Sequence, residues 1–158
     1  MSRNTIFASI IWLVLAGVIY YLADSVLNPN KIAVLGESRT VVLQRGTDGH
    51  YRAEALINGN KVDVLVDTGA TGVAISQAVA NKLGLTSRTA IRTSTANGDT
   101  VAYMTRLDSV KLGGVEANDV GAVIAPGLNG DVLLGMSFLG RMDVRLYKGE
   151  MTIQQVEE

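Results

Sequence analysis

From about residue 41 onward the chain consists of short, strand-length runs separated by turn-forming residues. Residues 51–57 and 61–66 flank Asn58-Gly59, a pair that suits the two positive-φ positions of a tight β-hairpin. Similar patterns predict two more hairpins: residues 91–105 around Asn97-Gly98, and residues 107–112 with 115–124 around Gly113-Gly114. Strands are also expected near residues 144–147 and 151–156, around Lys148-Gly149. Such spacing is typical of an antiparallel β domain.

Two short helices interrupt this pattern. Ser76 can cap a helix whose apolar residues share one face, and Gly84 can end it. A second helical turn is expected over residues 137–142, after the short apolar strand 132–134. Many short strands with one or two short helices predict an all-β fold, closed or nearly closed into a barrel.

The N-terminal segment has a different character, because residues 5–22 carry no charge. As a helix, these roughly 18 residues would span about 27 Å, close to the thickness of a bilayer's hydrocarbon core. Arg3 precedes the run and Asp24 follows it, which predicts a cytoplasmic N-terminus. A cleaved signal peptide is the alternative, but the apolar run is long for one and Ala23-Asp24-Ser25 is a poor cleavage site.

These patterns divide the chain into four parts. The expected boundaries are a cytoplasmic tip at 1–4, a transmembrane anchor at 5–23, a linker at 24–40 and a single β-rich domain at 41–158.

Composition excludes several classes of function. Net charge is −1, so no basic excess points to nucleic acid as a partner. The chain has no cysteine and one histidine, so it lacks a thiol nucleophile, thiolate metal ligands and the H-E-x-x-H zinc motif. We expect no metal and no cofactor.

The segment with the clearest chemical signal is Val64-Leu65-Val66-Asp67-Thr68-Gly69-Ala70-Thr71, in which an apolar strand leads directly into an acid and then into small residues. A carboxylate at such a place is costly to bury alone, unless it is hydrogen-bonded or shares a proton with a second carboxylate. Two facing carboxylates with one proton can activate water for hydrolysis of a peptide bond. The alternative is structural: Asp67 could simply end the strand in an Asx turn.

The segment VLVDTGAT resembles the active-site loop of retropepsin-like aspartic proteases. Downstream, Leu133-Leu134-Gly135 resembles the second signature of that family, which packs behind the loop. The run STANGDT, residues 94–100, occupies the place of the family's flap, a hairpin that closes over bound peptide. The whole pattern is similar to bacterial, single-pass members of the family.

This resemblance implies a retropepsin-like acid protease β-barrel, with Asp67 as the catalytic acid and base. It further implies that Thr68 braces two loops across a dimer interface, and that the residues after it line the substrate floor. By the same resemblance the floor includes Gly69, Ala70 and Thr71, and the flap includes Thr95, Ala96, Asn97 and Gly98. The Asn-Gly tip departs from the glycine-rich tip of the viral enzymes.

A single D-T-G in the domain implies that a complete site needs two copies, so the expected state is a homodimer. The expected partners are an extended peptide or protein substrate and a membrane bound through residues 5–23, with the domain on the outer face (periplasmic in a Gram-negative bacterium). The alternative is a catalytically silent, dimeric peptide-binding or assembly module of the same fold.

Other polar residues near these motifs are expected to be structural. Asp63 shares a strand face with Asp67, but four residues of strand separate them by about 13 Å, too far for a catalytic pair. Asp131 and Asp143 are expected in loops or turns. Ser137 is expected to cap a helix, because the sequence around it departs from a serine nucleophile elbow.

Overall fold

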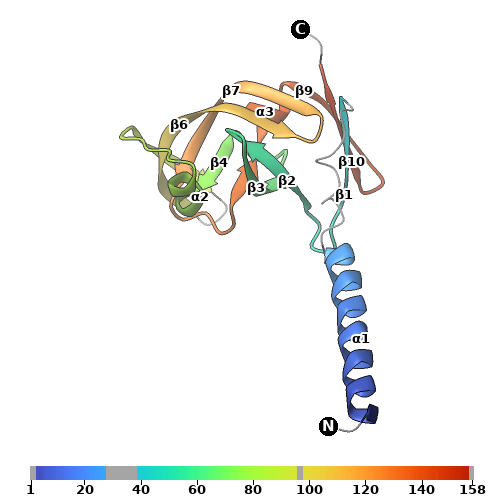
Figure 1. Cartoon of the computed structure of the whole chain (residues 1–158). Coiled ribbons are helices and arrows are strands. Elements are labelled where there is room, and N and C mark those ends of the chain that lie inside the picture. Colours follow the sequence, from blue (N-terminus) through green and yellow to red (C-terminus); the bar gives the residue numbers. More distant parts are fainter. Residues whose placement is uncertain (1–2, 28–38, 96–97, 157–158) are drawn as a thin grey trace.

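The computed structural model of the chain describes residues 3–27, 39–95 and 98–156. It consists of a long N-terminal helix, α1 (Arg3–Leu27), and a β domain that Figure 1 draws apart from it. Ten strands and two short helices follow α1 among the described residues. The strands are β1 (Thr40–Gln44), β2 (Tyr51–Ile57), β3 (Asn60–Val66), β4 (Val73–Ser76), β5 (Ala90–Thr95), β6 (Gly98–Leu112), β7 (Val115–Ala125), β8 (Val132–Leu134), β9 (Met142–Tyr147) and β10 (Glu150–Gln155), and the helices are α2 (Gln77–Lys82) and α3 (Met136–Leu139).

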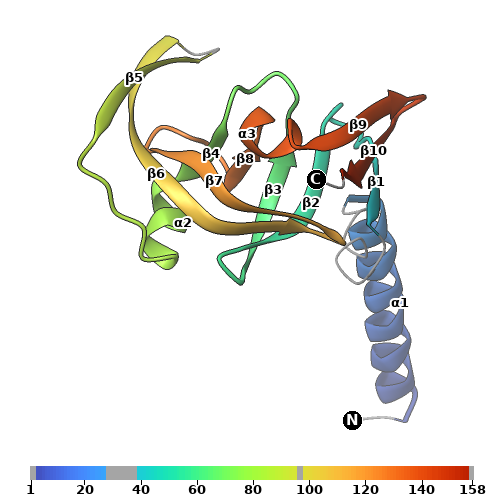
Figure 2. The same ribbon diagram turned by 90° about the horizontal axis from the view of Figure 1, so that it is seen from above.

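Six strands close into a barrel, seen from above in Figure 2. Hydrogen bonding runs in the order β2-β3-β8-β4-β7-β6, and β6 pairs with β2 again at Ile57 and Val110. β5 lies outside this ring, against the first half of β6. The predicted closed, all-β domain with two short helices is confirmed.

The hairpin turns have the predicted geometry. Asn58 and Gly59 have φ values of 48° and 76°, and Lys148 and Gly149 have 47° and 85°. These left-handed values suit Asn58 and the two glycines, whereas Lys148 adopts its value without such a preference. The second and third predicted hairpins share one long strand, β6, which was not expected as a single element.

A separate three-stranded sheet, in the order β1-β10-β9, flanks the barrel. β1 has alternating exposure, with Val41 and Leu43 buried and Val42 exposed, yet the sequence interpretation assigned no strand there. β4 was also missed. Asp143 was expected in a loop or turn, and this is wrong, because it lies within β9.

Aliphatic side chains fill the interior of the domain. Alternate residues of each barrel strand point inward, as in β3, where Val62, Val64 and Val66 are buried and Asp63 is exposed. Phe138 of α3 is fully buried among them. The core therefore fixes which side chains of β3 and β8 face outward, and that outward face carries the candidate site.

The N-terminal helix begins two residues before the predicted anchor and runs four residues past it. Among the described residues, no helix meets the length and apolar character needed to cross a bilayer. The anchor at residues 5–23 stays a prediction. Most of the expected linker, residues 28–38, lies outside the described residues.

Candidate active site

Asp67 follows the last residue of β3 directly. Strand β3 runs parallel to β8, with Val66 opposite Leu134, and the Asp67 N–H donates to the Leu134 carbonyl at 3.1 Å. This bond continues the ladder one residue beyond the strand, so the acid is held at a fixed point on β8. Its side chain is half-buried.

The loop after Asp67 folds back on the acid. The Gly69 N–H donates to Asp67 Oδ1 at 2.8 Å, and the Ala70 N–H donates to the Asp67 carbonyl at 3.3 Å. The bond from Gly69 is the one expected if Asp67 simply ends the strand in an Asx turn. It uses one carboxylate oxygen, and within the described residues Oδ2 accepts no hydrogen bond. The second oxygen is therefore available to a water molecule or to another carboxylate.

The segment of the second signature contacts this loop. The Met136 N–H donates to the Ala70 carbonyl at 2.9 Å, which joins the end of the loop to the start of α3. Gly135 lies so close to the loop that a Cβ there would fall 2.7 Å from the Ala70 carbonyl oxygen. Only glycine fits a backbone approach of this kind. Leu134 and Gly135 thus act as the support of the loop that carries Asp67.

Ser137 makes a contribution that the sequence interpretation missed. Its Oγ accepts from the Val73 N–H at 2.9 Å and donates to the Gly121 carbonyl at 2.8 Å. The predicted role as a helix cap is wrong, because Gly135 is the N-cap of α3 and makes no side-chain cap bond. No motif identifies a serine that ties two backbones 16 and 64 residues away in the sequence.

The predicted floor residues lie together on the surface. Thr68, Gly69 and Thr71 are exposed and Ala70 is half-buried. An exposed loop next to a half-buried carboxylate can contact both a substrate and a second copy of the chain.

The predicted flap is the β5–β6 hairpin. Thr95 pairs with Gly98, whose φ of 105° suits glycine, and the tip residues Ala96 and Asn97 lie outside the described residues. In both views of the fold this hairpin projects away from the barrel (Figures 1 and 2). The structure thus confirms a hairpin at the expected place and leaves its contacts with substrate as a prediction.

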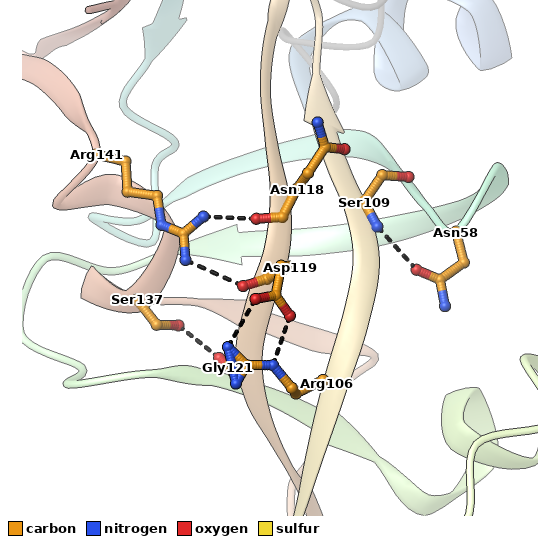
Figure 3. A network of polar contacts seen from close by, with 8 residues as sticks. All are labelled: Asn58, Arg106, Ser109, Asn118, Asp119, Gly121, Ser137 and Arg141. Atoms are coloured by element: carbon orange, nitrogen blue, oxygen red, sulfur yellow. Dashed lines mark hydrogen bonds and ion pairs between the residues drawn. The ribbon is translucent and has the colours of Figure 1, made fainter. Parts of the chain in front are cut away.

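A polar network braces the strand that Ser137 contacts (Figure 3). Asp119 of β7 has a φ of 53°, and Arg106 binds its carboxylate with Nε and Nη2. From the other side, Arg141 donates to the carbonyls of Asn118 and Asp119 at 2.6 and 3.0 Å. Arg141 therefore satisfies two backbone acceptors at the point where the β6–β7 register skips Asp119.

Residues 53–141 match the model of the family described as "gag-polyprotein putative aspartyl protease". The chain belongs to this family of aspartyl proteases. The matched segment includes the loop of Asp67, the flap hairpin and the second signature.

Similar proteins support this membership. A retropepsin-like aspartic protease from Rickettsia conorii, known from its crystal structure, is 31% identical; the match has a TM-score of 0.66 and covers 73% of this chain and 90% of that one. EIAV protease, solved with an inhibitor, is 22% identical, with a TM-score of 0.50 and coverage of 60% and 88%, and it shows the fold alone.

Two relatives are known from their sequences. An uncharacterized protein encoded 5′ of cobV in Sinorhizobium is 32% identical over 73% of this chain, and an uncharacterized protein of Rickettsia prowazekii is 41% identical over 64%. The matches cover 53% and 45% of those proteins, so the chain spans about half their length. The retropepsin-like resemblance is confirmed for family and fold, whereas membership of a membrane-anchored bacterial group stays a prediction.

Proposed function

We propose that this member of the aspartyl protease family is an endopeptidase whose active site needs two copies of the chain, each contributing Asp67. The observation that carries the proposal is the environment of that carboxylate. One oxygen is held by the Gly69 N–H, and the other accepts no bond from the described residues. A facing carboxylate and a bound water could therefore complete the site.

Two facing aspartates can hydrolyse a peptide bond without a metal or a covalent intermediate. Because like charges about 3 Å apart do not both ionise easily, the pair holds one proton. The ionised carboxylate takes a proton from water, and that water attacks the scissile carbonyl. The protonated carboxylate donates to the carbonyl oxygen and later helps the amine to leave.

Dimerisation is the second part of the proposal. The chain contains one D-T-G sequence, and the loop that carries it exposes Thr68 and Gly69. A two-fold axis beside this loop would bring both copies of Asp67 together and allow Thr68 to brace the pair. The substrate would be an extended peptide segment, held between this floor and the β5–β6 hairpin.

We also propose that residues 5–23 hold the chain at a membrane, with the domain on the outer, in a Gram-negative bacterium periplasmic, face. The support comes from the uncharged run of residues 5–22 and from exposed apolar side chains on α1, among them Trp12 and Leu13 at 69% and 73% exposure. Flotation with lipid vesicles of the whole chain, and of a chain that begins at residue 36, tests this attachment.

The Asx bond favours a second candidate, a dimeric peptide-binding or assembly module without activity. A bond from Gly69 to Asp67 is also what a purely structural turn would contain. In that case the domain would bind peptide without cleaving it, and Asp67 would only stabilise the turn through its bond with Gly69.

Substitution of Asp67 separates the two candidates. The whole chain in mild detergent would be incubated with an unfolded protein between pH 4 and 9, beside Asp67→Asn and a control, Asp108→Asn, which removes an exposed acid elsewhere. Peptidase function requires cleavage that is lost in Asp67→Asn and kept in the control. Because alkaline pH removes the shared proton, the rate should be higher in mild acid.

The dimer is tested by the dependence of rate on enzyme concentration and by light scattering. If the active species is a weak dimer, the rate rises with the square of the concentration. A wild-type chain that dimerises and binds peptide but cuts nothing at any pH would favour the silent module.

A further inference from the structure

A hollow of about 270 Å³ lies on the face of the barrel that carries Asp67. Its walls come from β2, β3, β8 and the turn that precedes β8. In β3 the residues alternate, so Asp63 and Leu65 point outward and Asp67 continues the same side. The hollow therefore begins about 7 Å along the strand from the candidate catalytic carboxylate.

The near part of the hollow is apolar. Leu65 and Leu133 lie opposite each other across the parallel β3–β8 pair, and Leu128 approaches from the turn. All three are half-buried, so each leaves part of its side chain open to the hollow. Ligand pockets are commonly 300–1,000 Å³, so a space of this size suits a single side chain.

The far part of the hollow is acidic. Asp63 and Asp131 line it, and within the described residues neither carboxylate has a hydrogen-bond or ion-pair partner. Both also line an adjoining hollow of about 260 Å³ beside α2. They differ from Arg52, Glu54 and Lys61, which line the same hollows and form ion pairs.

The cationic side chains around the two acids have partners other than Asp63 and Asp131. Arg52 binds Asp48 at 3.0 Å, and Lys61 binds Glu54 at 2.9 Å. In the adjoining hollow, the Lys82 amino group donates to the Lys61 carbonyl at 3.2 Å. The three cations named here compare with four carboxylates: the two that form ion pairs, together with Asp63 and Asp131. The region therefore carries one more carboxylate than cations.

We propose that this hollow binds a lysine or arginine side chain of the peptide substrate, close to the scissile bond. The methylene groups of that side chain lie along the three leucines, and its cationic end reaches Asp63 and Asp131. Long basic side chains combine these two properties, an apolar stem and a charged tip. An acidic side chain would meet two carboxylates there, and an aliphatic one would leave them without a partner.

This inference rests on the proposed peptidase function and is tested with the same preparation. The whole chain would digest an unfolded protein, with cleavage sites mapped by mass spectrometry. The mapped sites show at which position, relative to the cleaved bond, Lys and Arg are enriched. Peptides that differ only at this position, with Lys, Arg, Leu or Glu there, would then give kcat/KM values. Because exposed ion pairs are worth up to about fivefold each, we expect a three- to tenfold preference for Lys or Arg over Leu.

Variants connect the preference to the two acids. Asp63→Asn and Asp131→Asn should each lower the Lys-to-Leu ratio about two- to fivefold, and the double variant should abolish the preference. Asp108→Asn, an exposed acid of β6 that does not line the hollow, should leave the ratio unchanged. Raising the salt concentration to 0.5 M should lower the wild-type ratio through screening.

The outcomes separate this inference from the function on which it rests. Asp67-dependent cleavage with equal rates for Lys and Leu peptides, or a ratio that survives in the double variant, overturns the basic-side-chain site and leaves the peptidase. Absence of any Asp67-dependent cleavage overturns both. If the double variant fails to fold, as judged by circular dichroism, the single variants and the salt series decide.

Discussion

Gly135 and Gly72 contact each other through their backbones, with no room for a side chain between them. A Cβ on Gly135 would overlap the carbonyl oxygen of Gly72 and lie 2.7 Å from that of Ala70. The loop that begins at Asp67 therefore rests directly on the strand-to-helix connection behind it. The same connection also holds Asp67 and Ala70 by backbone hydrogen bonds.

Replacing Gly135 by alanine should destabilise the domain by at least about 2 kcal/mol, because backbone atoms on both sides must shift to admit the methyl group. Urea unfolding followed by circular dichroism gives the difference directly. Gly127→Ala is a matched control, since a Cβ there meets nothing within 4 Å. Equal midpoints for the two variants would contradict the close approach.

Ser137→Ala should cost about 1–3 kcal/mol, because it leaves the Val73 N–H and the Gly121 carbonyl without their side-chain partner in a part-buried place. If the chain is a peptidase, kcat should fall more than KM changes, since Val73 follows the active-site loop. The hydroxyl of Ser109 makes no bond within the described residues, so Ser109→Ala is the control for both readouts. If Ser137→Ala is as stable as the control, the two hydrogen bonds of Ser137 do not stabilise the domain.

The sequence predicted the parts of the fold that depend on local chemistry. The turn at Asn58-Gly59 could be predicted because positive φ values at both positions favour Asn and Gly. The placement of Asp67 at the end of a strand, and of residues 132–134 in a short strand before a helix, followed from a recognisable motif at the right spacing.

What the sequence did not predict depends on partners distant in the chain. β4 has four residues and is defined by its pairing with β7 and β8, not by its own pattern. Ser137 acts through backbone groups 16 and 64 residues away. Asp63 and Asp131 looked like ordinary surface acids, and only the parallel pairing of β3 with β8 puts them beside one hollow.

Asp119 provides a test of backbone conformation. Its φ of 53° is tolerated by Asp or Asn but not by a β-branched residue, so Asp119→Val should destabilise the domain by about 1–2 kcal/mol. Asp119→Asn keeps the conformation and loses only the exposed ion pair with Arg106, so we expect a change below about 1 kcal/mol. Thermal unfolding of the two variants distinguishes backbone strain from loss of the ion pair. Equal decreases in stability for both variants would assign the effect to the ion pair.

The acid side of the stability profile should depend on Asp48 and Asp143. The backbone N–H of His50 and the Arg52 side chain lower the pKa of Asp48, and Arg145 lowers the pKa of Asp143. Groups whose pKa is lower in the folded state stabilise it above their unfolded pKa, about 3.9, and lose that effect as the pH falls through the folded pKa.

We therefore expect the unfolding free energy of the wild type to decrease as the pH falls below about 4, and to decrease less steeply in the double variant Asp48→Asn/Asp143→Asn. Urea midpoints measured between pH 2 and 6 provide the comparison. Both acids are on the surface, so the difference between the two chains should shrink when salt screens their arginine partners. Parallel profiles for the two chains across this range would show that neither carboxylate changes its affinity for protons on folding.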